Sequence, residues 1–99
     1  MEGFALEERA KQIAALLKLL ANRHRLLILC GLMERPMTVG ETANIVPDIT
    51  RSALSQHLGL LKAHGILADR KSGQSVTYSI ADHRVGEIIR VLQKYYCDL

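Results

Sequence analysis

A mainly α-helical fold with one small β-hairpin in its C-terminal half is predicted by three features of this sequence. Apolar residues recur at helical spacing over most of the 99 residues. In residues 75–80 they alternate with polar residues instead, which is the pattern of a half-buried strand. Capping residues, two prolines and scattered glycines separate the apolar segments. At this length the chain is expected to form a single domain over residues 1–99.

The first two helices are predicted from their apolar residues. The first, over residues 6–20, carries one stripe made of Ile13, Leu16, Leu17 and Leu20. Asn22 is a suitable N-cap for the second helix, which is expected to end near Glu34. Because the apolar residues of this second helix lie nearly all round it, we expect it to be central and buried.

Two further helices each begin after a threonine. Thr38 and Glu41 have the spacing of a capping box, so a short third helix is expected there, ending before Pro47. Thr50 can cap the fourth helix, which Gly65 ends. One side of this fourth helix is apolar, with Leu54, Leu58 and Leu61. Its other side is polar and carries Arg51, Ser52, Ser55, Gln56 and Lys62.

The alternating residues 75–80 are expected to pair with residues 66–71 across the turn 72–74. Asp82 can cap a last helix with Val85, Ile88, Ile89, Leu92 and Tyr96 along one side. The resulting order, α-α-α-α-β-β-α, is that of a winged helix-turn-helix. In this fold the second helix of the helix-turn-helix enters the major groove of DNA.

Positive charge is concentrated in the segment that would face DNA. Residues 50–78 contain four cationic side chains and one anionic side chain. The charge of this segment is therefore +3, which is also the formal net charge of the whole chain. This concentration is typical of a phosphate-binding face, although an ordinary solvated surface has the same composition. The expected contacts with double-stranded DNA on the fourth helix are Arg51, Ser52, Ser55, Gln56, His57 and Lys62. Those of the hairpin, to phosphate or the minor groove, are Arg70, Lys71, Gln74 and Ser75.

Other classes of protein receive little support. The sequence has no glycine-rich phosphate loop, no His-Glu-x-x-His and no Cys-x-x-Cys, so we expect no enzyme, no catalytic residue and no cofactor. No apolar run reaches the roughly 18 residues of a membrane span, and the start does not resemble a signal peptide. The expected location is therefore the cytoplasm, with no membrane partner. A module that binds proteins rather than DNA remains an alternative.

Three segments carry a resemblance to a known family: residues 20–29 (LANRHRLLIL), 50–58 (TRSALSQHL) and 61–67 (LKAHGIL). Together with Arg70, Gly73 and residues 78–80, they resemble the ArsR/SmtB family of winged-helix repressors over essentially the whole chain. The resemblance implies a homodimer that binds an imperfect palindromic operator in a promoter and is released by an inducer. The first and last helices would join the two copies, with Leu16, Leu20, Ile88 and Leu92 at or near the interface.

Many members of this family sense metal ions, and two of their common metal sites require residues at defined places in the sequence. One needs a cysteine pair on the third helix, which here has no Cys or His. The other needs Asp, His and a later His and Glu on the last helix. Asp82, His83 and Glu87 are present without the second His, so we expect no metal site and interpret His83 as a surface residue.

The two cysteines, Cys30 and Cys97, suggest a different signal. One branch of the family, the BigR- and SqrR-type repressors, carries a cysteine at each of these places. The resemblance implies that persulfides or other small reactive sulfur species link the two sulfurs and so loosen DNA binding. The residues themselves leave two alternatives open, which are ordinary core cysteines and a thiol site for a metal or metalloid.

Overall fold

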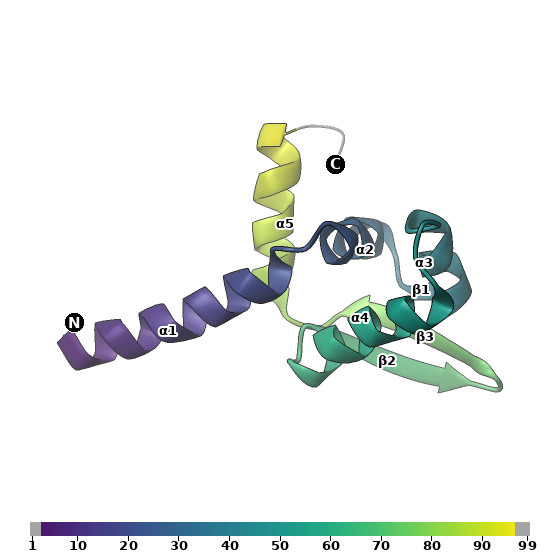
Figure 1. Cartoon of the computed structure of the whole chain (residues 1–99), viewed down its shortest axis with the longest axis horizontal. Coiled ribbons are helices and arrows are strands. Elements are labelled where there is room, and N and C mark those ends of the chain that lie inside the picture. Colours follow the sequence, from purple (N-terminus) through teal and green to yellow (C-terminus); the bar gives the residue numbers. More distant parts are fainter. Residues whose placement is uncertain (1–2, 97–99) are drawn as a thin grey trace.

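The structure, a computed structural model, describes residues 3–96, with Phe4 described by its backbone alone. These residues form five helices and three strands (Figure 1): α1 (Gly3–Leu20), α2 (Arg23–Glu34), β1 (Met37–Thr38), α3 (Val39–Ile45), α4 (Arg51–Ala63), β2 (Leu67–Ser72), β3 (Ser75–Ile80) and α5 (His83–Tyr96). This order confirms the predicted mainly α-helical fold with a winged helix-turn-helix arrangement. In the described part of the chain, no helix combines the length and apolar character needed to cross a membrane.

The predicted caps fix where the inner helices begin. Asn22 accepts a hydrogen bond from the backbone N–H of Arg25 at 3.1 Å. Thr38 and Glu41 form the capping box in both directions, and Thr50 accepts from the backbone N–H of Ala53 at 3.0 Å. Each bond satisfies one of the N–H groups that a helix start leaves without a partner.

The first helix begins at Gly3, three residues earlier than predicted. No capping residue or proline precedes Leu6, so nothing in the sequence starts the helix there. Most of α1 extends away from the other elements, and only its C-terminal end meets them (Figure 1). The radius of gyration is accordingly 14.6 Å, compared with about 13 Å expected for a compact chain of this length.

The sheet contains one strand that the sequence did not predict. Its order is β1-β3-β2, with both pairings antiparallel. The two residues of β1 pair with Thr77 and Tyr78, and a strand of two residues is too short to show an alternating pattern. The predicted hairpin is confirmed, but its first strand is shifted by one residue to Leu67–Ser72 and its turn consists of Gly73 and Gln74 alone. Ser72 pairs with Ser75, and Gly73 takes the positive φ of 61° that the tight turn requires.

The core is built around α2, as its apolar sequence predicted. Ile28 and Leu29 are fully buried, and α2 contacts α3, α5 and β3. Leu27 is the exception to all-round burial, because its side chain is 37% exposed. The remaining large buried side chains from α4 and α5 are Leu54, Leu58, Leu61, Val85 and Ile89. Any movement of α2 against α4 or α5 must therefore disturb close packing.

Candidate nucleic-acid interface

The helix-turn-helix consists of α3, the turn 46–50 and α4. Pro47 and the cap at Thr50 end one helix and start the next. Helix α4 is amphipathic, because Leu54, Leu58 and Leu61 are buried against the core while the side with Ser55 is exposed. The packing of its apolar stripe thus fixes which side chains α4 presents to the outside.

Four of the predicted DNA contacts on α4 lie on this exposed side: Arg51, Ser52, Ser55 and Gln56. Together they offer a guanidinium fork, an amide and two hydroxyls, which are the groups that read base edges in a major groove. Among the described residues, no ion pair involves Arg51. Its charge is therefore not neutralised by a neighbouring carboxylate in that part of the chain.

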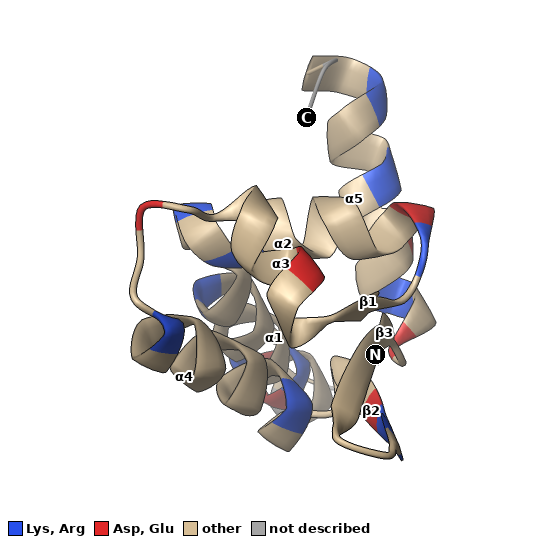
Figure 2. Ribbon diagram, turned by 90° about the vertical axis from the view of Figure 1, so that its right-hand side faces the viewer, with Lys and Arg blue, Asp and Glu red and all other residues tan. Residues whose placement is uncertain are grey.

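The hairpin β2–β3 places the other predicted contacts next to α4. Arg70, Lys71, Gln74 and Ser75 are all exposed, and α4 with the hairpin forms the lower side of the molecule in Figure 1. Figure 2 shows Lys and Arg at both ends of α4. Of the ion pairs that residues 3–96 form, none includes Arg70 or Lys71.

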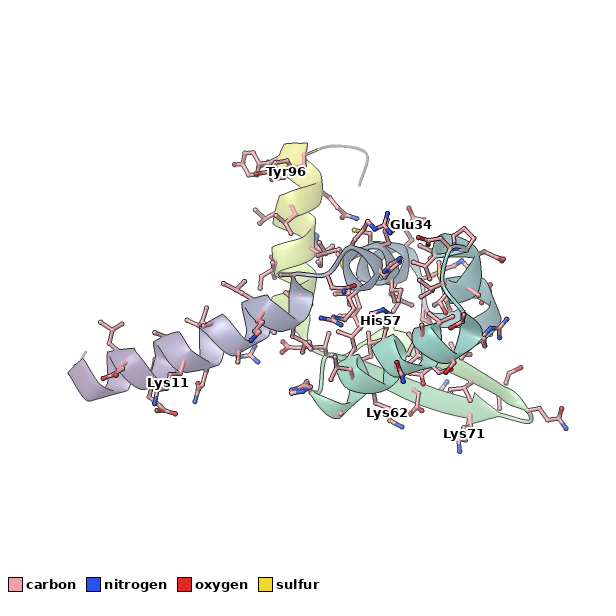
Figure 3. The ribbon with its side chains drawn as sticks, in the orientation of Figure 1. Lys11, Glu34, His57, Lys62, Lys71 and Tyr96 are labelled. Atoms are coloured by element: carbon pink, nitrogen blue, oxygen red, sulfur yellow. The ribbon has the colours of Figure 1, made fainter. Side chains whose placement is uncertain are left out.

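Lys62 also points to this lower side, as Figure 3 shows for Lys62 and Lys71. Unlike Lys71, it makes an ion pair, because its Nζ lies 2.9 Å from Oδ2 of Asp69 on β2. The hydrogen bond to Asp69 raises the pKa of Lys62 above its ordinary value. This pair links the C-terminal part of α4 to the hairpin, and half of the Lys62 side chain remains exposed.

His57 departs from its predicted place among the DNA contacts. Its side chain is half-buried against α2, where Nδ1 lies 3.3 Å from Nη1 of Arg25 and the ring centroid 5.8 Å from that of His24. Burial, followed by the charge of Arg25, lowers the pKa of the His57 imidazole. The sequence held a signal for this position, because His57 stands three residues after Leu54 and four before Leu61 on the buried side.

Cys30 is half-buried on α2 beside the core, and Cys97 lies outside the described residues. Burial raises the pKa of the Cys30 thiol, and a hydrogen bond from Gln93 on α5 partly opposes this increase. Within residues 3–96, no three His, Cys, Asp or Glu side chains are grouped closely enough to hold a metal ion. His83, at the start of α5, is exposed.

The residues predicted at or near a dimer interface differ in their accessibility. Leu20 is only 5% exposed inside the chain's own core, so it offers almost no surface to a partner. Leu16, Ile88 and Leu92 are half-buried against the same core. The accessible apolar side chains of these two helices are instead Leu6, Ile13, Leu17, Val91, Tyr95 and Tyr96. The sequence alone did not distinguish the buried apolar residues of α1 and α5 from the accessible ones, because it does not show where α1 leaves the core.

Both the sequence and the fold are similar to those of known bacterial regulators. Residues 22–69 match the family described as "Bacterial regulatory protein, arsR family". The transcriptional activator HlyU of Vibrio cholerae is 37% identical over 92 residues, which cover 93% of this chain and 84% of HlyU. The structure of reduced HlyU superposes with a TM-score of 0.87 and 36% identity, over 95% of this chain and 98% of that one.

Two further proteins are similar over most of the chain. The biofilm growth-associated repressor of Agrobacterium fabrum is 36% identical over 93 residues, covering 94% of this chain and 79% of the repressor. Mb0332 of Mycobacterium bovis, described as a homodimeric winged helix-turn-helix DNA-binding domain and a possible ArsR-family regulator, has a TM-score of 0.79 at 26% identity. That match covers 96% of this chain and 87% of the Mb0332 fragment.

Proposed function

Because the chain belongs to the ArsR family of bacterial regulatory proteins and is a DNA-binding transcriptional regulator, we propose that it represses its target promoter as a homodimer. Its relatives include both an activator, HlyU, and a repressor, the biofilm growth-associated protein. Repression requires only that the dimer occupy the promoter. The operator is an imperfect palindrome, because a two-fold symmetric dimer presents the same α4 to each half-site.

The exposed side of α4 carries this proposal. Arg51, Ser55 and Gln56 read bases, while Arg70 and Lys71 of the hairpin hold phosphates. The support is their placement, since these side chains are exposed and the three cations have no ion-pair partner in the described part of the chain. Phosphate contacts set the register of a protein on DNA, and base contacts supply the sequence preference.

The test is selection of DNA by the purified protein from a library of random duplexes. We expect enrichment of one sequence, the selected duplex, with two inverted half-sites about 10 base pairs apart between centres. Enrichment of a sequence without internal symmetry would contradict the dimeric operator. Failure to enrich any sequence would contradict base reading by α4.

Replacing Gln56 by alanine should weaken binding of the selected duplex by about 1–3 kcal/mol and relax the base preference at one position of each half-site. Gln56 is exposed on α4, and its amide can make two hydrogen bonds to an adenine edge. Fluorescence anisotropy with the selected duplex and single-base variants measures both effects. Gln12→Ala on α1 is the matched control and should leave the preference unchanged. An equal loss on every duplex would contradict the role assigned to Gln56.

Replacing Lys71 by alanine should weaken binding of the selected and a scrambled duplex to a similar extent. Each phosphate contact releases condensed counterions, so the slope of log K against log salt should become shallower by roughly one unit per subunit. Lys11→Ala on α1 removes the same charge away from the hairpin and should keep the original slope. The assignment fails if Lys71→Ala changes sequence preference while the salt dependence stays constant.

The homodimer is proposed to form through α1 and α5. Leu6, Ile13 and Leu17 are between 50% and 58% exposed and lie along one side of α1, whose N-terminal part extends away from the other described elements (Figure 1). Val91 and Tyr95 add exposed apolar surface on α5. A helix gains most of its stability in proteins from packing of its apolar side, which a second copy would supply. The similarity to Mb0332, which is described as homodimeric, supports a homodimer.

The inducer is proposed to be a reactive sulfur species that links Cys30 and Cys97. A thiolate takes the outer sulfur of an organic persulfide and releases the organic thiol. The second cysteine then attacks the inner sulfur of the protein persulfide and expels hydrosulfide, which leaves a disulfide. Because burial raises the pKa of Cys30, we assign the first attack to Cys97. The similarity to a structure described as reduced HlyU favours a redox signal over other kinds of inducer.

A further inference from the structure

A polar cluster that the sequence did not reveal joins α2 to the helix-turn-helix. Asp48 in the turn lies with Oδ2 3.2 Å from Nε2 of His24 and 3.1 Å from Nη2 of Arg23, both at the start of α2. The next residue of α2, Arg25, contacts His57 of α4, and the ring of His24 also lies beside that of His57. Two residues of the DNA-binding motif, one in the turn and one on α4, are thus tied to neighbouring positions of α2.

The contact between Arg25 and His57 requires an uncharged imidazole. A guanidinium group only donates hydrogen bonds, so Nδ1 of His57 must accept from Arg25 at 3.3 Å. A proton on Nδ1 would remove this hydrogen bond and place two positive charges against each other. Arg25 is itself held, because its Nε donates to the carbonyl oxygen of Leu19 at 2.6 Å. Protonation of His57 therefore disfavours the present packing of His57, and of α4 with it, against Arg25.

His24 couples the turn to this contact. The carboxylate of Asp48 only accepts, so Nε2 of His24 donates to it, and the contact becomes an ion pair when His24 carries a second proton. Arg23 lies 3.4 Å from the same nitrogen. The hydrogen bond from His24 lowers the pKa of Asp48, so that carboxylate stays ionised throughout the range in which histidines titrate. A charged His24 would pair with Asp48 and place positive charge next to His57.

We propose that Asp48, His24, Arg25 and His57 form a proton-sensitive clamp, which holds α4 in its DNA-reading position at neutral pH and releases it in mild acid. The proposal rests on the DNA-reading role proposed for α4. His24 and Arg25, both on α2, are the titratable and charged groups that act on His57, and Asp48 and Arg23 act on it through His24.

The direction of the effect follows from proton linkage. The pKa of His57 is lower in the folded protein than in the unfolded chain, so the unfolded chain binds more protons between the two values. The stabilisation from neutral His57 is complete well above about pH 6.5 and is lost as the pH falls below this value. Because α4 carries His57, we expect the loss to appear in sequence-specific binding.

The experiment measures affinities for the selected duplex and for a scrambled duplex between about pH 7.5 and about pH 5.5, the range in which histidine titrates. The ratio of the two affinities is the readout, because added positive charge strengthens binding to any DNA. We expect the ratio to fall by roughly tenfold in acid, within the usual range for coupled sites. His57→Asn, which keeps an acceptor near Nδ1 but gains no proton, should make the ratio independent of pH.

His83→Asn is the matched control and should behave as the original protein. A ratio that does not change with pH, or that changes equally in His57→Asn, would overturn the clamp. NMR titration of the DNA-free protein separates this failure from failure of the proposed function. His57 should take up its proton at a lower pH in the folded protein than in urea, whether or not any duplex is selected. Equal titration in the two states would also overturn the clamp.

Discussion

Placing a charge at Ile13 is expected to convert the protein into a monomer and to weaken binding of the selected duplex by at least about 100-fold, because two linked half-site contacts gain that much from each other. Ile13 is 56% exposed at the middle of the apolar side of α1. In the proposed dimer, Ile13→Glu would place a carboxylate in an apolar interface, where burial of a charge is costly. Sedimentation at micromolar concentration measures the mass, and fluorescence anisotropy measures the affinity.

The matched control is Lys11→Glu, which puts the same side chain on α1 facing away from α5, as the position of Lys11 in Figure 3 shows. Lys11→Glu lowers the net charge of the protein further than Ile13→Glu does. A purely electrostatic effect on DNA binding would therefore be larger in the control. We expect Lys11→Glu to remain dimeric. If Ile13→Glu sediments as a dimer and binds normally, α1 does not join the subunits through this side.

Treatment with an organic persulfide is expected to release the original protein from the selected duplex and to leave Cys30→Ser and Cys97→Ser bound. The link needs both sulfurs, so removal of either one blocks it. A fall in affinity of about tenfold or more on linkage is within the range of known coupling between sites. Each variant should bind DNA under reducing conditions, since serine is close in size to cysteine.

Mass spectrometry of the same samples identifies the chemistry. The original protein should show a cross-link between Cys30 and Cys97, either a disulfide or a chain with added sulfur. Cys30→Ser should collect persulfide at Cys97 faster than Cys97→Ser collects it at Cys30, because burial raises the pKa of the Cys30 thiol. Release of either variant to the same extent as the original protein would exclude a switch made of the two thiols.

The sequence predicted those parts of the fold that depend on local interactions. The three-residue spacing of Thr38 and Glu41 is itself the geometry of a capping box, so the start of α3 required no knowledge of the rest of the chain. Gly73 fixed the turn of the hairpin for the same reason, since few other residues adopt its positive φ. The four polar residues on the exposed side of α4 followed from the position of its leucines.

Several features that depend on tertiary packing were not predicted. Strand β1 exists because β3 offers it a free edge, and its two residues carry no pattern of their own. Whether Leu20 is buried depends on where α1 leaves the core, and helical spacing does not contain that information. The contacts of Asp48 with α2 join residues more than 20 positions apart. Such contacts are visible only once the turn and α2 are placed together.

Binding of the selected duplex with one half-site scrambled tests the central claim, which is that a dimer reads two half-sites with two copies of α4. We predict that scrambling either half-site lowers the affinity by about 100-fold or more, because the remaining contact loses its linked partner. Footprinting on the intact duplex should show two protected patches about 34 Å apart on one face of the DNA. A half-scrambled duplex that binds as tightly as the intact one, with a single protected patch, would contradict the account.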